Sequence, residues 1–199
     1  GMSNYASIDL AKQEQPLRIE LAQLEDALQL IVHSILFHRT LGAKVVPEEV
    51  RIFDLCYVKC KDVQVDLEVN QKVKAVSDTL KKSGSNSGLV NVDFFTTSSS
   101  ILGERRGATW ELWTVHVELL RDPSYDEEEL QRRRRDLARQ LEQILWNIVL
   151  AVNQQRAHIP RIEGSGADRH RVLCFPFDVT TNQPKGWTLG SILRPPAFF

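Results

Sequence analysis

The segment that most constrains the fold is residues 110–120, which alternates between apolar and polar side chains and contains two tryptophans. One face of this segment would carry Trp113, Val115, Val117 and Leu119, and the other Thr114, His116 and Glu118. Because successive side chains of a strand point to opposite faces, this period of two predicts a half-buried strand. A charged segment with helical spacing follows it directly, so the chain combines strands with helices.

Apolar spacing also predicts the other elements. From Leu17 to about Thr40, apolar residues recur at alternating spacings of four and three, which predicts one long amphipathic helix ending at Gly42. Residues 1–15 lack a pattern and predict a flexible tail, in which Gly1 ahead of Met2 is typical of an expression-tag remnant. The remaining predictions are a buried strand over 50–60, a helix over 67–80, a strand over 90–94, a hairpin-like connection over 96–107, a helix over about 123–153 capped by Asp122, and an edge strand over 173–179. This order predicts a single α+β domain over residues 16–199, with central helices packed on a mostly antiparallel sheet.

Composition argues against several classes of function. The 199 residues carry a formal net charge of −1, which does not indicate nucleic-acid binding. The longest apolar run, residues 28–37, is interrupted by polar residues and is shorter than the roughly 20 residues that span a bilayer. With no secretory signal pattern either, we expect a cytoplasmic protein without a transmembrane segment.

The residue types that carry catalysis or bind metals do not form a recognisable pattern. His33 and His38 are five residues apart on one predicted helix and would point in different directions, so a shared metal is not expected. Cys56, Cys60 and Cys174 are an odd number of cysteines in apolar runs, which indicates reduced thiols in a core. We therefore expect a protein that is not an enzyme and binds no cofactor. A thiol enzyme stays open as a minor hypothesis, because a nucleophilic cysteine needs no local motif.

A run of four arginines, residues 132–135, follows the acidic residues 127–129 on the long third helix. The spacings of three and four between the acids and the arginines favour a solvated helix face that pairs with itself. A surface that contacts a partner protein is the alternative.

Three segments resemble the autophagy-related protein 101 family of HORMA-domain proteins. They are residues 32–42 at the end of the first helix, residues 110–115 of the two-tryptophan strand, and residues 147–160. The resemblance extends over about residues 17–181. It implies a HORMA domain in an open-like state and a non-enzymatic adaptor that pairs with the HORMA domain of autophagy-related protein 13. It also implies that the adaptor stabilises this partner within the autophagy-initiating kinase complex, at the phagophore assembly site.

The resemblance further implies where the partner binds. In HORMA dimers the surface would involve the start of the third helix and the neighbouring end of the first helix. This makes His38, Arg39, Gln131, Arg132 and Arg133 the expected interface residues. For His38 and Arg39, a favourable interaction of cations with a helix C-terminus is an equally good explanation.

The family also carries an exposed loop with a tryptophan and a phenylalanine, which recruits later factors. The corresponding loop here, residues 94–107, has no tryptophan. Either this lineage lacks the recruiting tip, or Ile101 and Leu102 replace it as a smaller apolar tip, or the loop has been shortened. The alternative function is a peptide-capturing HORMA protein of the spindle-checkpoint or meiotic type. Such a protein would close its C-terminal segment around a ligand and protect residues 171–199 from proteolysis.

Overall fold

The computed structural model describes residues 5–40, 45–100, 103–122, 124–154, 156–161 and 172–181. In chain order, the elements are β1 (Ala6–Ala11), β2 (Leu17–Glu20), α1 (Leu24–Arg39), β3 (Pro47–Ile52), β4 (Leu55–Cys60), α2 (Val63–Lys82), β5 (Ser87–Ser100), β6 (Gly103–Leu120), α3 (Glu127–Gln154) and β7 (Phe177–Thr181). The predicted α+β class is confirmed, and the arrangement is compatible with the HORMA type.

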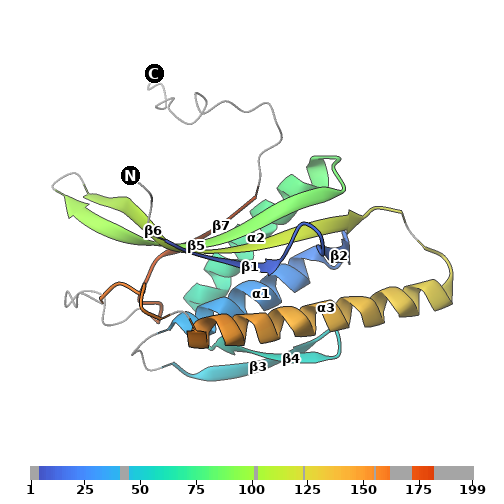
Figure 1. Ribbon diagram of the computed structural model, residues 1–199, viewed down its shortest axis with the longest axis horizontal. Coiled ribbons are helices and arrows are strands. Elements are labelled where there is room, and N and C mark those ends of the chain that lie inside the picture. Colours follow the sequence, from blue (N-terminus) through green and yellow to red (C-terminus); the bar gives the residue numbers. More distant parts are fainter. Residues whose placement is uncertain are drawn as a thin grey trace, which may run out of the picture.

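The main sheet is built around the long strands β5 and β6. Its order is β1-β6-β5-β7, and β2 pairs with β6 farther along the same edge as β1. The β5–β6 and β5–β7 pairs are antiparallel, whereas β1 and β2 both run parallel to β6. Figure 1 shows the β5–β6 hairpin extending beyond the body of the sheet as an arm.

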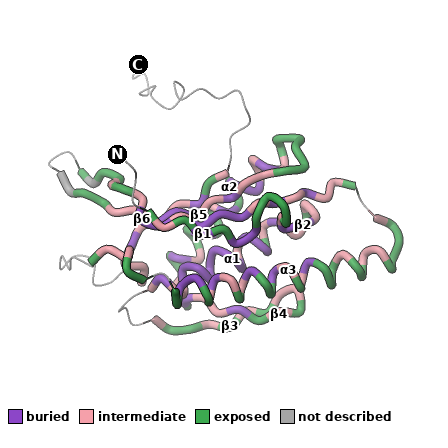
Figure 2. The backbone as a smooth tube through the Cα atoms, in the orientation of Figure 1, coloured by how far each residue is buried: buried purple, intermediate pink, exposed green. Residues whose placement is uncertain are grey.

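α1 and α3 lie between this sheet and the small antiparallel hairpin β3–β4, whereas α2 packs against α1 and β7 (Figure 1). α1 is the central helix, because it contacts α2, α3 and β4. Most of its residues are buried, and the buried positions run along the whole helix in Figure 2. The α1 positions that are at most 1% exposed are Leu24, Ala27, Leu28, Leu30, Ile31, Val32, Ile35 and Leu36.

The strand predicted over 110–120 is confirmed as the inner part of β6. Trp113, Val115, Val117 and Leu119 are at most 1% exposed and face the helices. Their partners Val90 and Val92 on β5 are buried on the same face. This apolar layer closes the core on the sheet side.

The N-terminal segment differs from the sequence prediction. Residues 6–11, expected within a flexible tail, form β1, in which Ile8 and Leu10 are buried. Residues 17–20, expected in the first helix, form β2, with Leu17 and Ile19 buried and Arg18 exposed. Each alternating segment is too short to be distinguished from a tail or a helix by its own pattern, and pairing with β6 determines its structure.

The segment predicted as one strand over 50–60 is a hairpin. Phe53 and Asp54 form its turn with φ of 53° and 60°. Two successive left-handed residues are typical of the tight turns that connect antiparallel strands, although they are usually Asn-Gly or Asp-Gly. The described helices include none that is long and apolar enough to cross a membrane.

Candidate partner-binding surface

The long helix α3 forms one side of the molecule and presents its outer face to solvent (Figures 1 and 2). Its buried stripe consists of Leu137, Leu141, Ile144, Ile148, Ala151 and Val152. The helix begins at Glu127, and the Asp126 carboxylate accepts a hydrogen bond of 3.1 Å from the Glu128 amide. Asp126 therefore occupies the capping position that was predicted for Asp122, and the acids of the first turn interact favourably with the helix dipole.

The three interface residues predicted on α3 differ in their accessibility. Arg132 has a side chain that is 66% exposed, and among the described residues it pairs with Glu129 alone. Arg133 is 23% exposed, and its guanidinium donates to Glu129 at 2.9 Å and to Glu20 at 3.3 Å. Gln131 is exposed and donates to Glu127 at 2.8 Å. Arg132 and Gln131 are thus free to approach a partner, whereas Arg133 joins α3 to the end of β2.

The C-terminal half of α3 carries two exposed apolar side chains that the sequence analysis did not single out. Trp146 is 59% exposed and Leu150 is 50% exposed. They are four residues apart, so they are neighbours on the helix surface, opposite the buried stripe. The outer face of α3 therefore combines arginine near its start with tryptophan and leucine near its end. The sequence could have revealed the exposure of Trp146 and Leu150, because both fall outside the apolar stripe that the helical spacing predicts.

The end of α1 is part of a buried polar cluster. The Arg39 guanidinium donates two hydrogen bonds to the Glu111 carboxylate, at 2.8 and 2.7 Å, and the side chains are 3% and 0% exposed. Trp113 Nε1 donates to Glu111 at 2.6 Å, and His158 Nε2 lies 2.6 Å from the same carboxylate. Arg39 also lies over the Trp113 ring, 5.7 Å from its centroid. The cluster joins the end of α1, strand β6 and the segment that follows α3.

His38 lies beside this cluster and is partly exposed. Its ring packs edge-on against Phe37, with 5.6 Å between the ring centroids. Burial, together with the adjacent Arg39 charge, holds the pKa of His38 below its usual range. His38 is therefore uncharged at neutral pH.

The structure does not bring the two groups of predicted interface residues together. α1 and α3 run in the same direction, so the start of α3 lies near Glu20 before α1, and the end of α3 lies near Arg39 (Figure 1). From Arg133 to the end of α3 is roughly 30 Å at 1.5 Å per residue. The expectation that the start of the third helix neighbours the end of the first is wrong. The order of the elements along the chain does not specify this relation.

The histidine and cysteine residues considered as catalytic or metal-binding groups are separated. His33 is buried and its pKa is lowered to about 4, mainly by desolvation, so its 3.8 Å approach to Asp66 is not an ion pair at neutral pH. Burial raises the pKa of the Cys60 thiol, which is the opposite of what a nucleophile requires. Cys56 is exposed, contrary to the expected core position. No group of three or more metal-ligating side chains is found within the described parts of the chain.

Ile101 and Leu102, the expected apolar tip of the recruiting loop, lie outside the described residues. The strands on either side of them are longer than predicted, because β5 and β6 continue to Ser100 and from Gly103. Their cross-strand pairs include Thr97 with Arg106 and Ser98 with Arg105. The described part of the arm is therefore polar.

Comparison with known proteins decides the family. The family model described as Autophagy-related protein 101 matches residues 16–166. The chain belongs to the autophagy-related protein 101 family. It is 25% identical to Autophagy-related protein 101 of Arabidopsis thaliana over 189 residues, which cover 84% of this chain and 85% of that protein. It is also 24% identical over 160 residues to Autophagy-related protein 101 of Xenopus laevis, with 72% of each chain covered. Membership of the autophagy-related protein 101 family confirms the resemblance and assigns the chain a role in autophagy.

Proposed function

We propose that this chain is a non-enzymatic adaptor that pairs with the HORMA domain of autophagy-related protein 13. In this role it stabilises its partner, belongs to the autophagy-initiating kinase complex and acts in the cytoplasm at the phagophore assembly site. The observation that carries the proposal is membership of the autophagy-related protein 101 family over residues 16–166.

The outer face of α3 supports a protein interface. Exposed arginine and tryptophan side chains are the types most enriched among residues that dominate binding energy. Arg132 supplies the first and Trp146 the second, on one rigid helix. Gln131 and Leu150 lie on the same helix and extend this surface. Arg133 contributes by holding the start of α3 against β2.

The position of the partner divides the proposal into two testable forms. If the partner contacts the start of α3, Arg132 is at the interface. If it contacts the end of α1, His38 is at the interface. Arg39, which is buried, then acts indirectly by fixing the helix end through its ion pair with Glu111. Because these positions lie at opposite ends of α3, one substitution at each distinguishes the two forms.

The experiment is size-exclusion chromatography with light scattering of this chain mixed with the HORMA domain of autophagy-related protein 13. We expect a one-to-one complex that Arg132→Glu weakens at least about tenfold, the loss of one charged hot-spot contact. Arg18→Glu is the matched control, because Arg18 has a similarly exposed side chain that also pairs with one carboxylate among the described residues, but lies on β2. Loss of the complex with His38→Asp instead would place the partner at the end of α1.

Failure to form any complex at micromolar concentrations would overturn the pairing. Peptide capture would then become the better hypothesis. The result that would favour it is protection of residues 171–199 from proteolysis only when a peptide is added.

A further inference from the structure

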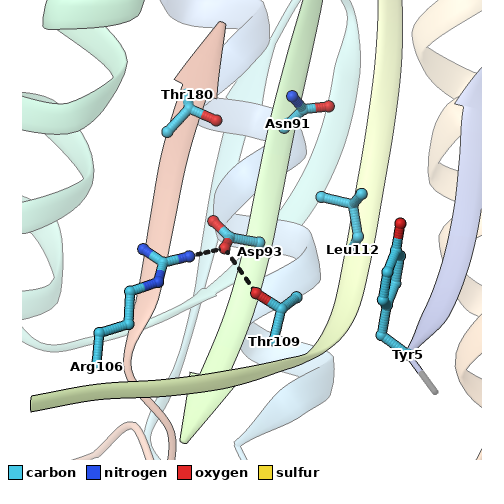
Figure 3. Close-up of a pocket in the computed structure, with 7 residues that line it drawn as sticks. All are labelled: Tyr5, Asn91, Asp93, Arg106, Thr109, Leu112 and Thr180. Carbon is cyan, nitrogen blue, oxygen red and sulfur yellow. Dashed lines mark hydrogen bonds and ion pairs between the residues drawn. The ribbon is translucent and has the colours of Figure 1, made fainter. Parts of the chain in front are cut away.

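The outer face of the main sheet, opposite the helices, contains a hollow of about 270 Å³. Figure 3 shows Asn91 and Asp93 of β5 at its floor, Arg106 and Thr109 of β6 beside them, and the Tyr5 ring at the opposite side. The hollow opens to solvent and lies next to the edge strand β7. None of these residues belongs to the α3 surface or to the Glu111 cluster.

Asp93 is the charged group at the floor, and it is 7% exposed. Its Oδ2 atom accepts hydrogen bonds from the Arg106 guanidinium and, at 3.3 Å, from the Thr109 hydroxyl. Arg106 also reaches Asp178 at 3.5 Å, and Lys72 pairs with the other oxygen of Asp178 at 3.3 Å. Arg106 and Lys72, the cations beside the hollow, are therefore already paired with the carboxylates of Asp93 and Asp178.

Two acceptor oxygens at the floor lack a donor from the described residues. The Oδ1 atom of Asn91 is shielded from solvent and accepts no hydrogen bond. The Oδ1 atom of Asp93 accepts none either, since both bonds of this carboxylate go to Oδ2 (Figure 3). A buried acceptor without a donor, as Asn91 Oδ1 is, destabilises the site. A ligand rich in donors would remove this destabilisation.

A positive charge on the ligand is favoured by the same groups. Burial raises the pKa of the Asp93 carboxyl, which shows that the Arg106 charge does not fully offset its desolvation. An aromatic ring, such as that of Tyr5, attracts a cation over its face. Guanidinium suits the site better than ammonium, because its rigid planar fork can donate to two acceptors at once.

We propose that this hollow binds an arginine side chain presented by an exposed segment of a partner protein. The Asp93 carboxylate and the unpaired Asn91 Oδ1 atom are complementary to a guanidinium, and this complementarity identifies the occupant. The open position of the hollow on a sheet face allows a side chain to enter from another protein surface. This inference is independent of the pairing proposed above.

The test is titration of the ¹⁵N-labelled full chain with the blocked pentapeptide acetyl-Gly-Ser-Arg-Ser-Gly-amide, followed by NMR. The matched probe replaces arginine by citrulline, which keeps the shape but removes the charge. We expect the arginine peptide to shift the amide signals of β5 and β6 around Asn91, Asp93 and Thr109. Its affinity should exceed that of the citrulline peptide at least about tenfold, as expected for a charge-assisted hydrogen bond.

Variants locate the site. Asp93→Asn and Asn91→Ala should each lower the affinity at least about tenfold, and Asn91→Ala keeps the test decisive if Asp93→Asn does not fold. Glu118→Gln is the control, because it neutralises a carboxylate on the same face of the sheet outside the hollow. Equal binding of the arginine and citrulline peptides, or unchanged binding by Asn91→Ala, would overturn the proposal.

Two further results would reject a partner protein as the source of the arginine. One is binding of free L-arginine without binding of the pentapeptide, which would indicate a free amino acid. The other is a pentapeptide that does not bind the unaltered chain but binds the double variant with Lys185→Gln and Arg194→Gln. That result would assign the hollow to a cation of this chain, since these two residues follow Thr181, the last residue of β7.

Discussion

Glu111 is the centre of the buried polar cluster at the end of α1. Its carboxylate accepts hydrogen bonds from Arg39 and Trp113 and lies 2.6 Å from the His158 ring. Breaking a buried ion pair by removing one charge typically costs 3–5 kcal/mol, because the remaining charge loses its compensation. We expect Glu111→Gln to lower the free energy of unfolding by roughly this amount, measured by urea denaturation.

The control for this prediction is a surface pair on the same strand. Glu118 pairs with Arg18 at 3.3 Å, and both side chains are well exposed. Exposed pairs contribute about 0–1 kcal/mol, so Glu118→Gln should change stability little. Equal effects of the two substitutions would contradict the view that the Arg39–Glu111 pair is a buried structural centre.

His33 makes stability depend on pH. Its pKa is 6.5 in the unfolded chain and about 4 in the folded protein, so the unfolded state binds more protons between these values. The stabilisation is present in full above pH 6.5 and is lost as the pH falls toward 4. At 1.36 kcal/mol per unit, the loss is about 3 kcal/mol.

Unfolding by urea at several pH values between 4 and 7 checks this prediction. His33→Gln cannot titrate, so its stability should vary less with pH than that of the unaltered chain. His38, whose pKa is also lowered, remains in both proteins. The same pH dependence in the two proteins would show that His33 is not the source.

At the scale of elements, sequence periodicity predicted the long segments and missed the short ones. The strand around Trp113 and the helix over 67–80 are confirmed, because each repeats its pattern over enough residues to exclude other periods. β1 and β2 have six and four residues, and their structure comes from parallel pairing with β6. Long-range pairing of this kind leaves no local signal.

The N-terminus of α2 offers a clean test of local helix stabilisation. The Asp62 carboxylate accepts hydrogen bonds of 2.9 Å from the amides of Gln64 and Val65. Loss of such a cap costs about 1 kcal/mol, so Asp62→Ala should lower the urea midpoint accordingly. Asp78→Ala, which removes an exposed carboxylate farther along the same helix, should have less than half of this effect. A larger loss with Asp78→Ala would contradict the capping role.

The β3–β4 turn contains a conformation that its sequence does not favour. Asp54 has φ of 60°, in the left-handed region where glycine is more stable than other residues. Asp54→Gly should therefore raise the free energy of unfolding by about 0.5–1 kcal/mol, whereas Asp54→Ala should lower it. Denaturation of the two variants in parallel measures the difference. A stabilising Asp54→Ala would show that the turn is not strained.

At the scale of the whole molecule, the sequence predicted candidate interface residues but not their arrangement. His38 and Arg39 lie at the end of α1, and Arg132 lies near the start of α3, as the apolar spacing predicted, although the cap of α3 is Asp126 and not Asp122. Their separation by most of the length of α3 depends on α1 and α3 running in the same direction, which no local pattern specifies. The burial of Arg39 likewise depends on Glu111, a residue 72 positions away.

The exposed apolar pair on α3, Trp146 and Leu150, can be tested for a role in binding the partner. Trp146 and Leu150 do not contribute to the core, so Trp146→Ala should leave the free energy of unfolding within about 0.5 kcal/mol of that of the unaltered chain. If the partner covers the whole outer face of α3, the same variant should weaken the complex with the autophagy-related protein 13 HORMA domain at least about tenfold. Isothermal titration calorimetry measures the affinity, and Leu67→Ala on α2, where the leucine is similarly exposed, serves as the control for Leu150→Ala on α3.

Weakening by Arg132→Glu without weakening by Trp146→Ala would confine the partner to the start of α3. The reverse result would place it over the C-terminal half, near His38, so the two measurements together orient the partner along the helix.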